Sequence, residues 1–463
     1  MSFSSIHFIF YFLPVFLLLF YLIPGIGKDI VLVAGSLIFY AWGNPVYVIL
    51  MLFSVFFNWL MGIDLEESET DSQKKRRLIF AIVINLFILC FFKYFGFLLD
   101  NLNHLTGLHI TMPELGLPLG ISFYTFKNLS YLFDVNKEKV RAERNLFRYM
   151  IYSTMFPHMT QGPIVRYTEV QAQLPLAKRK ITPARLGIGA EFFVKGLAKK
   201  VLLADNLGLM FSTITGSADH TVVSAWLGII AYTLQIYFDF SGYSDMAIGL
   251  GKALGFDFSK NFDYPYTSHS VSEFWRRWHM SLGSWFRDYI YIPLGGNRVS
   301  TGKHIRNILI VWALTGLWHG ASWNFVLWGV YYGILLLIEK FFLQNFLKNG
   351  HPALTRLYTL LMVVFGWVFF SQTSFGAIGN YFGRMFGFTA SGFLGSSTLY
   401  YLKTGGILFI IAIICARPSP QKRFRRLMRR KPAVAIGLNM LLFILSIAFM
   451  VYNSYSPFLY ANF

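Results

Sequence analysis

Apolar segments follow one another along almost the whole chain, and this pattern limits the folds that are open to it. The candidate segments are residues 5–24, 30–42, 46–63, 78–99, 119–133, 149–165, 186–214, 222–251, 305–318, 320–340, 356–371, 401–416 and 433–453. A helix that crosses a bilayer needs about 20 mostly apolar residues. Charged residues make up only 14% of the chain, well below the roughly 25% of soluble domains. The sequence therefore predicts an all-α, polytopic transmembrane helical bundle with about 11 spans.

Several of these segments are too short to cross a bilayer alone. Broken or re-entrant helices are tolerated at membrane depth only where they are buried in protein or line a cavity. The Phe-Pro-His-Met-Thr-Gln-Gly-Pro break at residues 156–163 is typical of such a segment, and so is the aromatic but charged region 256–300. We therefore expect re-entrant and interfacial helices beside the spans, within one integral-membrane domain that covers residues 1–463.

The net charge of +19 would indicate nucleic-acid binding in a soluble protein. Here the basic residues lie in loops between apolar segments, as they do in cytoplasmic loops of membrane proteins, so we expect no nucleic-acid partner. The basic stretches 74–77, 137–148, 178–185 and 417–431 predict cytoplasmic loops and place both the N- and the C-terminus outside. Stretch 417–431 holds eight basic residues and no acidic one. It is either a topology signal or a helix that lies on the inner leaflet, attracted by anionic lipid.

One titratable side chain lies inside an almost uncharged stretch. His319 stands between Ile308 and Ile338, with Trp318 before it and Asn324 shortly after it. An ionisable residue in a membrane segment is energetically costly and is therefore a functional candidate. Histidine can also transfer protons near neutral pH. His319 is the first candidate for a catalytic base, and the alternative is a buried neutral histidine that is satisfied by one hydrogen bond.

Two carboxylates lie in another apolar segment. Asp239 and Asp245 belong to residues 237–251, which also hold two Ser and three Gly. The glycines are most simply explained by close packing of helices. A buried carboxylate needs a partner. Asp245 is therefore a candidate for orienting a catalytic group or pairing with an arginine, and the alternative is simple helix capping.

A short helix is predicted to begin near residue 270. Ser270 or Ser272 is a suitable N-cap, and Glu273 would lie in the first turn. Arg276 and Arg277 would point toward lipid headgroups or an anionic ligand.

On this helix Trp275, Trp278 and His279 would share one face, because they are spaced three and four residues apart. Faces rich in tryptophan are common at membrane interfaces. His279 is therefore either a second functional histidine or a chance member of an interfacial anchor.

The sequence lacks the usual motifs of several other enzyme classes. No metal site is predicted, because neither a His-x-x-x-His nor a paired-Cys spacing occurs. A Walker loop, a dinucleotide fingerprint and a Gly-x-Ser-x-Gly elbow are also missing. Gly-Gly-Asn at residues 295–297 would let the backbone approach a phosphate-bearing ligand, although a tight turn alone explains it.

Three runs resemble the membrane-bound O-acyltransferase family. They are residues 237–251, 261–298 and 314–329. The second run contains Asn-Phe-x-Tyr-Pro-Tyr, Glu-Phe-Trp-Arg-Arg-Trp-His and Trp-Phe-Arg-Asp-Tyr-Ile-Tyr-Ile-Pro-Leu-Gly-Gly-Asn, and the third contains Gly-Leu-Trp-His-Gly-Ala-Ser-Trp-Asn. The resemblance is to the bacterial branch, which includes membrane proteins of alginate O-acetylation and of teichoic-acid D-alanylation. It extends over most of the chain, including residues 457–463.

The resemblance implies a multi-pass protein of the bacterial cytoplasmic membrane with a central funnel or tunnel. It implies that His319 is the catalytic histidine and His279 the second polar group of the site, within a core segment of residues 222–340. No cofactor would be bound permanently. A thioester donor, either acetyl-CoA or an acyl carrier protein, would be met from the cytoplasm. An extracytoplasmic acetyltransferase of the SGNH (Gly-Asp-Ser-Leu hydrolase) type would complete delivery to a polysaccharide, with membrane lipids around the chain.

The chemistry that follows is transfer of an acetyl group to a hydroxyl. His319 would take the proton of the hydroxyl, and the bundle would exclude the water that hydrolyses the donor. His279 would position the donor or stabilise the thiolate that leaves. One alternative in the same fold is D-alanyl transfer to teichoic acid from a carrier protein. Another is a transporter without acyl chemistry, because transporters also contain broken helices and buried charges.

Overall fold

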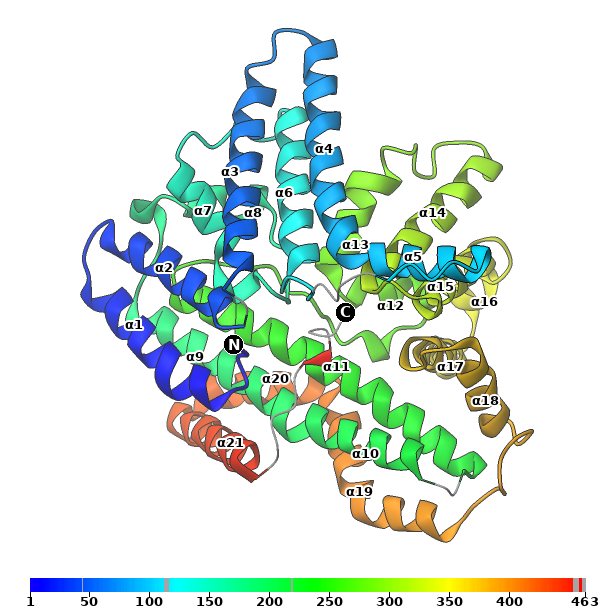
Figure 1. The fold of residues 1–463 in the computed structure, drawn as a ribbon. Helices are drawn as coiled ribbons and strands as arrows, with labels where there is room; N and C mark the ends of the chain where they lie inside the picture. The colour runs from blue at the N-terminus through cyan, green and yellow to red at the C-terminus, as the bar shows by residue number, and fades with distance from the viewer. Residues whose placement is uncertain (44, 112–115, 218–219, 453–457, 460–463) are drawn as a thin grey trace. The chain divides into compact units, whose positions relative to one another are not determined.

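Helices account for all of the regular secondary structure in the described residues. The computed structural model describes residues 1–43, 45–111, 116–217, 220–452 and 458–459 (Figure 1). No β-strand occurs among them, so the predicted all-α class is confirmed. Of the C-terminal run noted in the sequence, residue 457 and residues 460–463 lie outside the described residues. The described residues form two compact units: unit 1 has Met1–Phe193 and Ser244–Ser259, and unit 2 has Val194–Tyr243 and Lys260–Leu459.

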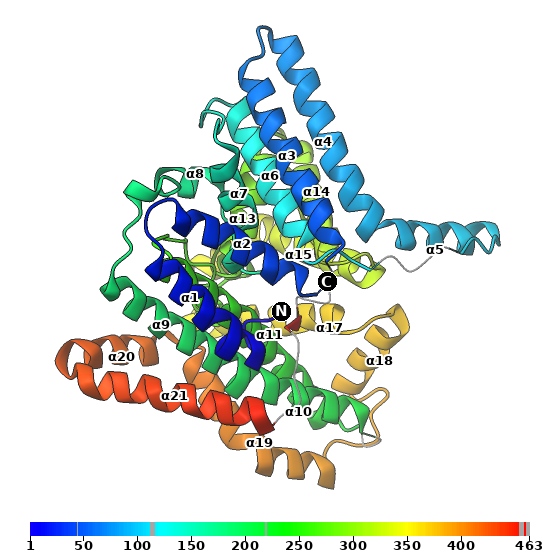
Figure 2. The same cartoon turned by 60° about the vertical axis from the view of Figure 1, so that its left-hand side comes forward.

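Unit 1 is held together by polar side chains between its longest helices. Its helices are η1 (Phe8–Phe12), α1 (Leu13–Leu22), α2 (Gly27–Ala41), α3 (Tyr47–Glu66), α4 (Asp71–Lys93), α5 (Phe95–Thr106), α6 (Ile121–Asn136), α7 (Leu146–Thr154), η2 (Phe156–His158), α8 (Tyr167–Val170), η3 (Gln171–Gln173) and η4 (Leu176–Lys178). Helices α3, α4 and α6 lie side by side in both views (Figure 1, Figure 2). The Asn58 amide donates to Asn85 at 3.1 Å, and Asn128 donates to Ser54 at 3.1 Å. Such bonds join helices where apolar burial alone gives little selectivity.

Two helices contribute residues to both units, α9 (Pro183–Ala198) and α11 (Val222–Ala253). Their glycines make close backbone contacts. Within unit 1, a Cβ added to Gly249 would lie 2.5 Å from the carbonyl oxygen of Gly189. Within unit 2, a Cβ added to Gly242 would lie 2.7 Å from the carbonyl oxygen of Gly196. The close packing predicted for the glycines of residues 237–251 is therefore confirmed.

Unit 2 contains the candidate catalytic residues. Its remaining helices are η5 (Lys199–Ala204), α10 (Asp205–Gly216), η6 (Pro265–Thr267), α12 (Val271–Arg277), α13 (Met280–Phe286), η7 (Arg287–Tyr291), α14 (Thr301–His319), α15 (Trp323–Phe341), α16 (Gln344–Asn349), α17 (Pro352–Ser371), α18 (Phe375–Met385), α19 (Ser396–Cys415), α20 (Pro418–Arg430) and α21 (Pro432–Tyr452). Helix α15 packs against α14 and α17, and the short α12 packs against both α15 and α17. Gly295 and Gly296 have φ of +97° and +57°, so the tight turn predicted at residues 295–297 is confirmed.

The number of full-length spans is smaller than the sequence suggested. Among the described residues, six helices are long and apolar enough to cross a membrane: α3, α11, α15, α17, α19 and α21. The bent pair α4 and α5 would make a seventh, with a 64° angle at the break. Several predicted segments are divided instead. Residues 149–165, for example, contain the end of α7, the turn η2 and non-helical backbone. The multi-pass character is confirmed, whereas the central funnel or tunnel stays a prediction.

Candidate active site

His319 is placed by a tightly packed pair of helices in unit 2. It is the last residue of α14, and α15 begins four residues later. The two backbones touch at two glycines. A Cβ on Gly316 would lie 2.2 Å from the carbonyl oxygen of Phe325, and a Cβ on Gly329 would lie 2.3 Å from that of Trp312. Only glycine permits this approach, so the end of α14 is fixed against the start of α15.

Aromatic rings surround the His319 imidazole, which is only 2% exposed. Its ring centroid lies 5.0 Å from Trp318, 4.9 Å from Trp328 and 5.2 Å from Phe370, each at a steep angle. Phe370 belongs to α17, so three helices contribute to this enclosure. Such an environment excludes water, which strengthens electrostatic interactions inside it.

His279 lies at a sharp corner between α12 and α13. Its φ is +43°, a left-handed conformation that costs a residue with a Cβ of the order of 1 kcal/mol. The imidazole is 2% exposed and packs against Phe240 and Trp318, with centroid distances of 4.6 and 5.7 Å. Its Nδ1 lies 3.3 Å from the side-chain oxygen of Asn261. Strained backbone of this kind is concentrated at functional sites.

The prediction that Trp275, Trp278 and His279 share one helical face is wrong. Helix α12 ends at Arg277, and the chain is extended at Trp278. Trp275 packs against Trp312 and Trp328, Trp278 packs against Phe274 and Trp367, and His279 packs against Phe240 and Trp318.

The physical reason is a backbone contact from an earlier loop. The Asp263 N–H donates to the Arg277 carbonyl at 2.9 Å, and the Met280 N–H donates to the Asn261 carbonyl at 2.9 Å. These bonds replace those that would have continued the helix past Arg277.

Asn261 was not singled out as a site residue, although it is the first residue of the run 261–298. Its side-chain oxygen accepts hydrogen bonds from the Ser281 N–H at 3.1 Å and the Ser281 hydroxyl at 2.9 Å. The residue is 1% exposed. Asn261 thus fixes both sides of the corner at His279. A buried asparagine must be satisfied in this way, but its neighbours Lys260 and Asp263 are charged, so no sequence signal marked it as buried.

The N-terminus of α12 is capped as predicted, and a second residue supports it. Ser270 accepts the Glu273 N–H at 2.9 Å, which confirms Ser270 as the N-cap. The buried carboxylate of Glu339, on α15, accepts the N–H groups of Val271 at 2.5 Å and Ser272 at 2.8 Å. A carboxylate at a helix N-terminus is favoured by the helix dipole. Glu339 was not predicted for this site, because it is distant along the chain from α12.

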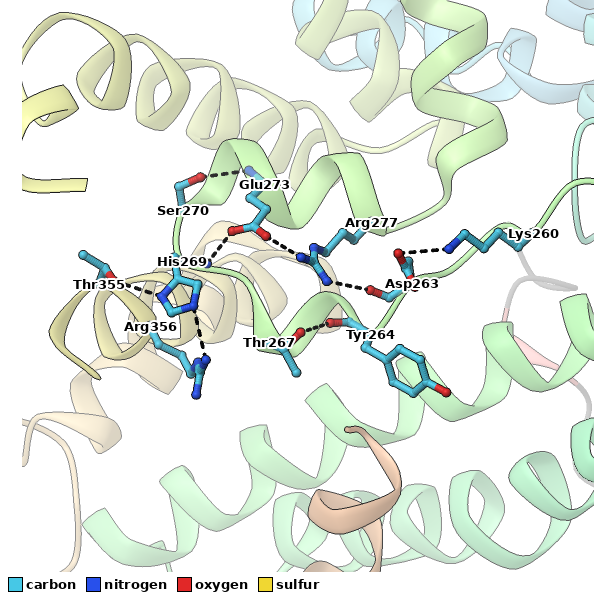
Figure 3. A network of polar contacts seen from close by, with 10 residues as sticks. All are labelled: Lys260, Asp263, Tyr264, Thr267, His269, Ser270, Glu273, Arg277, Thr355 and Arg356. Carbon is cyan, nitrogen blue, oxygen red and sulfur yellow. Dashed lines mark hydrogen bonds and ion pairs between the residues drawn. The ribbon is translucent and has the colours of Figure 1, made fainter. Parts of the chain in front are cut away.

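Arg277 does not point toward headgroups or a ligand, so that prediction is wrong for this residue. Its guanidinium donates to Glu273 at 2.6 Å and to the Asp263 carbonyl at 3.3 Å (Figure 3). Glu273 also accepts the His269 N–H at 2.8 Å (Figure 3). These bonds arise because Arg277 lies one helical turn after Glu273, next to the loop that ends the helix. Arg276 is exposed, and its orientation toward headgroups or an anionic ligand stays a prediction.

The structure brings some of the predicted residues together. His279 and His319 both pack against the Trp318 ring in unit 2. Asn324 lies in the first turn of α15, where it accepts from the Ser322 hydroxyl and donates to the Phe369 carbonyl at 3.4 Å.

The two predicted carboxylates have different settings. Asp239 is buried in unit 2 and lies 2.8 Å from the Lys200 ammonium, which also reaches Asp205 at 2.7 Å. Asp245 belongs to unit 1 and lies inside the long helix α11, so the helix-capping interpretation is wrong. Within the described residues, no three His, Cys, Asp or Glu side chains are grouped as metal ligands.

Burial lowers the pKa of the His279 imidazole to about 3. In the unfolded chain the ring would titrate near its ordinary value of about 6.5. The folded state therefore keeps His279 neutral, and the stability this contributes is complete above pH 6.5 and is lost as the pH falls toward 3. We expect acidification from pH 7 to pH 5 to cost about 2 kcal/mol through this residue.

The measurement is the apparent melting temperature in detergent at both pH values. His279→Gln should lose less stability on acidification than the parent protein. His109→Gln, which changes an exposed histidine, is the control and should behave as the parent does. An equal pH response of parent and His279→Gln would show that His279 is protonated in the folded state.

The sequence was compared with known proteins. Residues 50–379 match the model of the MBOAT, membrane-bound O-acyltransferase family. A probable alginate O-acetylase AlgI of Pseudomonas aeruginosa is 40% identical over 393 residues, covering 84% of this chain and 75% of that protein. A peptidoglycan O-acetyltransferase of Helicobacter pylori is 33% identical over 402 residues, covering 80% and 76%. A teichoic acid D-alanyltransferase of Bacillus subtilis is 28% identical over 275 residues, covering 56% and 69%. The matched region contains both His279 and His319.

Proposed function

The chain belongs to the membrane-bound O-acyltransferase family and is a multi-pass O-acyltransferase, and we propose that it transfers acetyl groups for the O-acetylation of an extracellular or cell-wall polysaccharide. The observation that carries this proposal is the pair of buried histidines packed on Trp318, inside the matched region. The acetyl group is favoured because the relatives that cover most of the chain are named for O-acetylation. The D-alanyl alternative has support from relatives that cover about half of it.

His319 acts as the general base in the proposed mechanism. A hydroxyl oxygen attacks the carbonyl carbon of an acetyl thioester while His319 takes the hydroxyl proton. The tetrahedral intermediate then breaks its carbon–sulfur bond, and the proton passes to the departing thiolate. The products are an O-acetyl ester and a free thiol. The rings of Trp318, Trp328 and Phe370 exclude the water that would otherwise hydrolyse the thioester.

His279 supports the reaction as a neutral imidazole. Burial holds its pKa near 3, so it is uncharged at physiological pH. Its Nδ1 faces the Asn261 oxygen at 3.3 Å, an acceptor, which favours a proton on Nδ1. Of the two roles expected for His279, the one that fits this tautomer is positioning of the donor, because Nε2 then carries no proton and cannot donate a hydrogen bond to the departing thiolate. Residues 222–340 form the catalytic core segment in this proposal.

The proposed setting is the bacterial cytoplasmic membrane, with both termini outside. The donor is acetyl-CoA, or an acyl carrier protein, and reaches the site from the cytoplasm. This sidedness is supported by the excess of 41 Lys and Arg over 22 Asp and Glu, which lies mainly in the loops assigned to the inner face. An SGNH-type acetyltransferase outside the membrane completes delivery to the polysaccharide.

The test is transfer of radiolabelled acetyl from acetyl-CoA by membranes that contain the chain, with membranes lacking it as the control. We expect acid-stable, alkali-labile label on an acceptor only where the chain is present, because an O-acetyl ester is cleaved by base. Label from a D-alanyl carrier protein, with none from acetyl-CoA, would support the D-alanyl alternative instead. Absence of label from either donor, with the SGNH-type partner present, would contradict the proposal.

A further inference from the structure

Helix α20 carries a dense array of basic side chains on its exposed surface. Those exposed are Lys422, Arg423, Arg425, Arg426, Arg429 and Arg430. The opposite face is half-buried against the protein and consists of Gln421, Phe424, Leu427 and Met428. The Lys195 ammonium, for example, lies 3.8 Å from the centroid of the Phe424 ring. The apolar face is therefore already occupied, and the basic face is the one available to a partner.

These cations are not neutralised by the chain itself. None of the basic residues of α20 forms an ion pair in the part of the chain that the structure describes. Elsewhere the chain does pair its cations, as Lys74 does with Glu138 and Arg185 with Asp257. Like charges at neighbouring positions of a helix repel one another. A bound anionic surface would remove this repulsion.

The connections of α20 place it at the level of the lipid headgroups. Only Ala416 and Arg417 separate it from α19, and only Lys431 separates it from α21. Both neighbours are long and apolar enough to span a membrane. A helix joined so closely to two spans cannot leave the membrane surface, where anionic phospholipids attract arginine and lysine. A soluble carrier protein would have to approach over those same headgroups.

A hydrogen bond joins α20 to the loop that holds His279. The Tyr264 hydroxyl donates to the Gln421 side chain. Tyr264 has a φ of +49°, a strained conformation that its surroundings must maintain. Two residues shortly before Tyr264 contact the corner at His279. The Asp263 N–H donates to the last residue of α12, and the Asn261 side chain faces the imidazole of His279. The position of α20 is thus linked to the corner at His279 through a few residues of unit 2.

We infer that the basic face of α20 is a binding surface for the headgroups of anionic phospholipids, and that its occupancy steadies the loop that positions His279. Tyr264 is the positioning residue between the two. Lipid binding stands independently of the reaction, whereas its effect on turnover rests on the proposed function.

The first experiment measures retained lipid on the purified full chain. The protein is placed in vesicles of phosphatidylcholine mixed with phosphatidylglycerol. It is then released from them, and the lipid that stays bound is measured by native mass spectrometry. The triple variant Arg425→Gln, Arg426→Gln, Arg429→Gln should retain phosphatidylglycerol about tenfold less than the parent. The matched control Lys75→Gln, Arg76→Gln, Lys180→Gln removes the same charge at exposed positions and should retain it as the parent does. Equal loss in both variants would overturn the proposal.

A second measurement keeps the inference testable if the α20 variant does not insert. The parent is irradiated with a photoactivatable phosphatidylglycerol analogue, and the labelled peptides are mapped. Label on residues 417–431 supports the inference, and label confined to other loops overturns it.

The third experiment concerns the link to the site. In nanodiscs, phosphatidylglycerol should raise kcat severalfold for the parent, while Tyr264→Phe should retain the lipid and lose this response. A Tyr264→Phe variant that responds as the parent does would overturn the link. A rise in the KM for acetyl-CoA in the α20 variant, with lipid retention unchanged, would assign this surface to the donor and overturn the lipid assignment. If no donor gives turnover, the proposed function fails. Lipid retention still tests whether the basic face of α20 binds anionic phospholipid.

Discussion

His319→Ala lowers acyl transfer by about 10²–10⁴-fold, which is the usual contribution of a general base. The imidazole is enclosed by the rings of Trp318, Trp328 and Phe370, none of which can take up a proton in its place. We expect the protein to remain inserted, because the α14–α15 contact depends on Gly316 and Gly329 rather than on the ring. The measurement is the initial rate of labelled acetyl transfer at equal amounts of membrane-inserted protein.

The matched control is His304→Ala, which removes a buried histidine of the same helix. His304 lies 3.0 Å from the Tyr291 hydroxyl and is remote in sequence from the aromatic cage. This variant should keep most of the activity if it inserts. If the His319→Ala protein fails to insert, the role of His319 is structural. If it inserts and transfers acetyl groups at the parent rate, His319 is not the general base.

Lys200→Met should destabilise the protein by about 3–5 kcal/mol, the usual consequence of leaving one half of a buried ion pair. The Lys200 ammonium is 2.8 Å from Asp239 and 2.7 Å from Asp205, and the Lys200 and Asp239 side chains are each 2% exposed. The Leu459 N–H, at 2.9 Å from Asp239, would remain as a weaker partner. The measurement is thermal unfolding in detergent, followed by tryptophan fluorescence.

Two further variants make this test specific. The double variant Lys200→Met, Asp239→Leu removes both charges and should recover much of the stability, because a buried pair is often replaceable by apolar side chains. Lys252→Met breaks a pair with Asp257, which is 55% exposed, and should cost at most about 1 kcal/mol. If Lys200→Met costs no more than Lys252→Met, the buried pair contributes little.

The sequence was sufficient for the helical class and for an N-cap at Ser270 or Ser272, of which the structure uses Ser270. It also singled out His279 and His319, whose catalytic roles stay a prediction. These features depend on local signals, namely runs of apolar residues, a titratable ring without charged neighbours, and a serine three residues before a glutamate. The corner at His279 could not be predicted from local signals. It exists because Asn261 and Asp263 take up backbone groups at the end of α12. The helical face expected for His279 was wrong for the same reason.

The partners of the buried charges could not be predicted from the sequence either. Asp239 and Lys200 are 39 positions apart, and Glu339 caps a helix that begins 68 positions earlier. Only packing brings such residues together, and a single sequence contains no distance information of this kind. Their chemistry could be anticipated, since a buried carboxylate needs a partner, but the partner itself could not.

The backbone contact between α14 and α15 has a kinetic consequence. Because Gly316 and Gly329 leave no space for sliding, the end of α14 cannot act as a gate. Donor and acceptor must instead reach a stationary base by displacing side chains around it. Rotation of tryptophan and phenylalanine rings in a packed interior is coupled to the motion of their neighbours. We therefore expect the exchange of substrates and products, rather than proton transfer, to set the pace of each turnover.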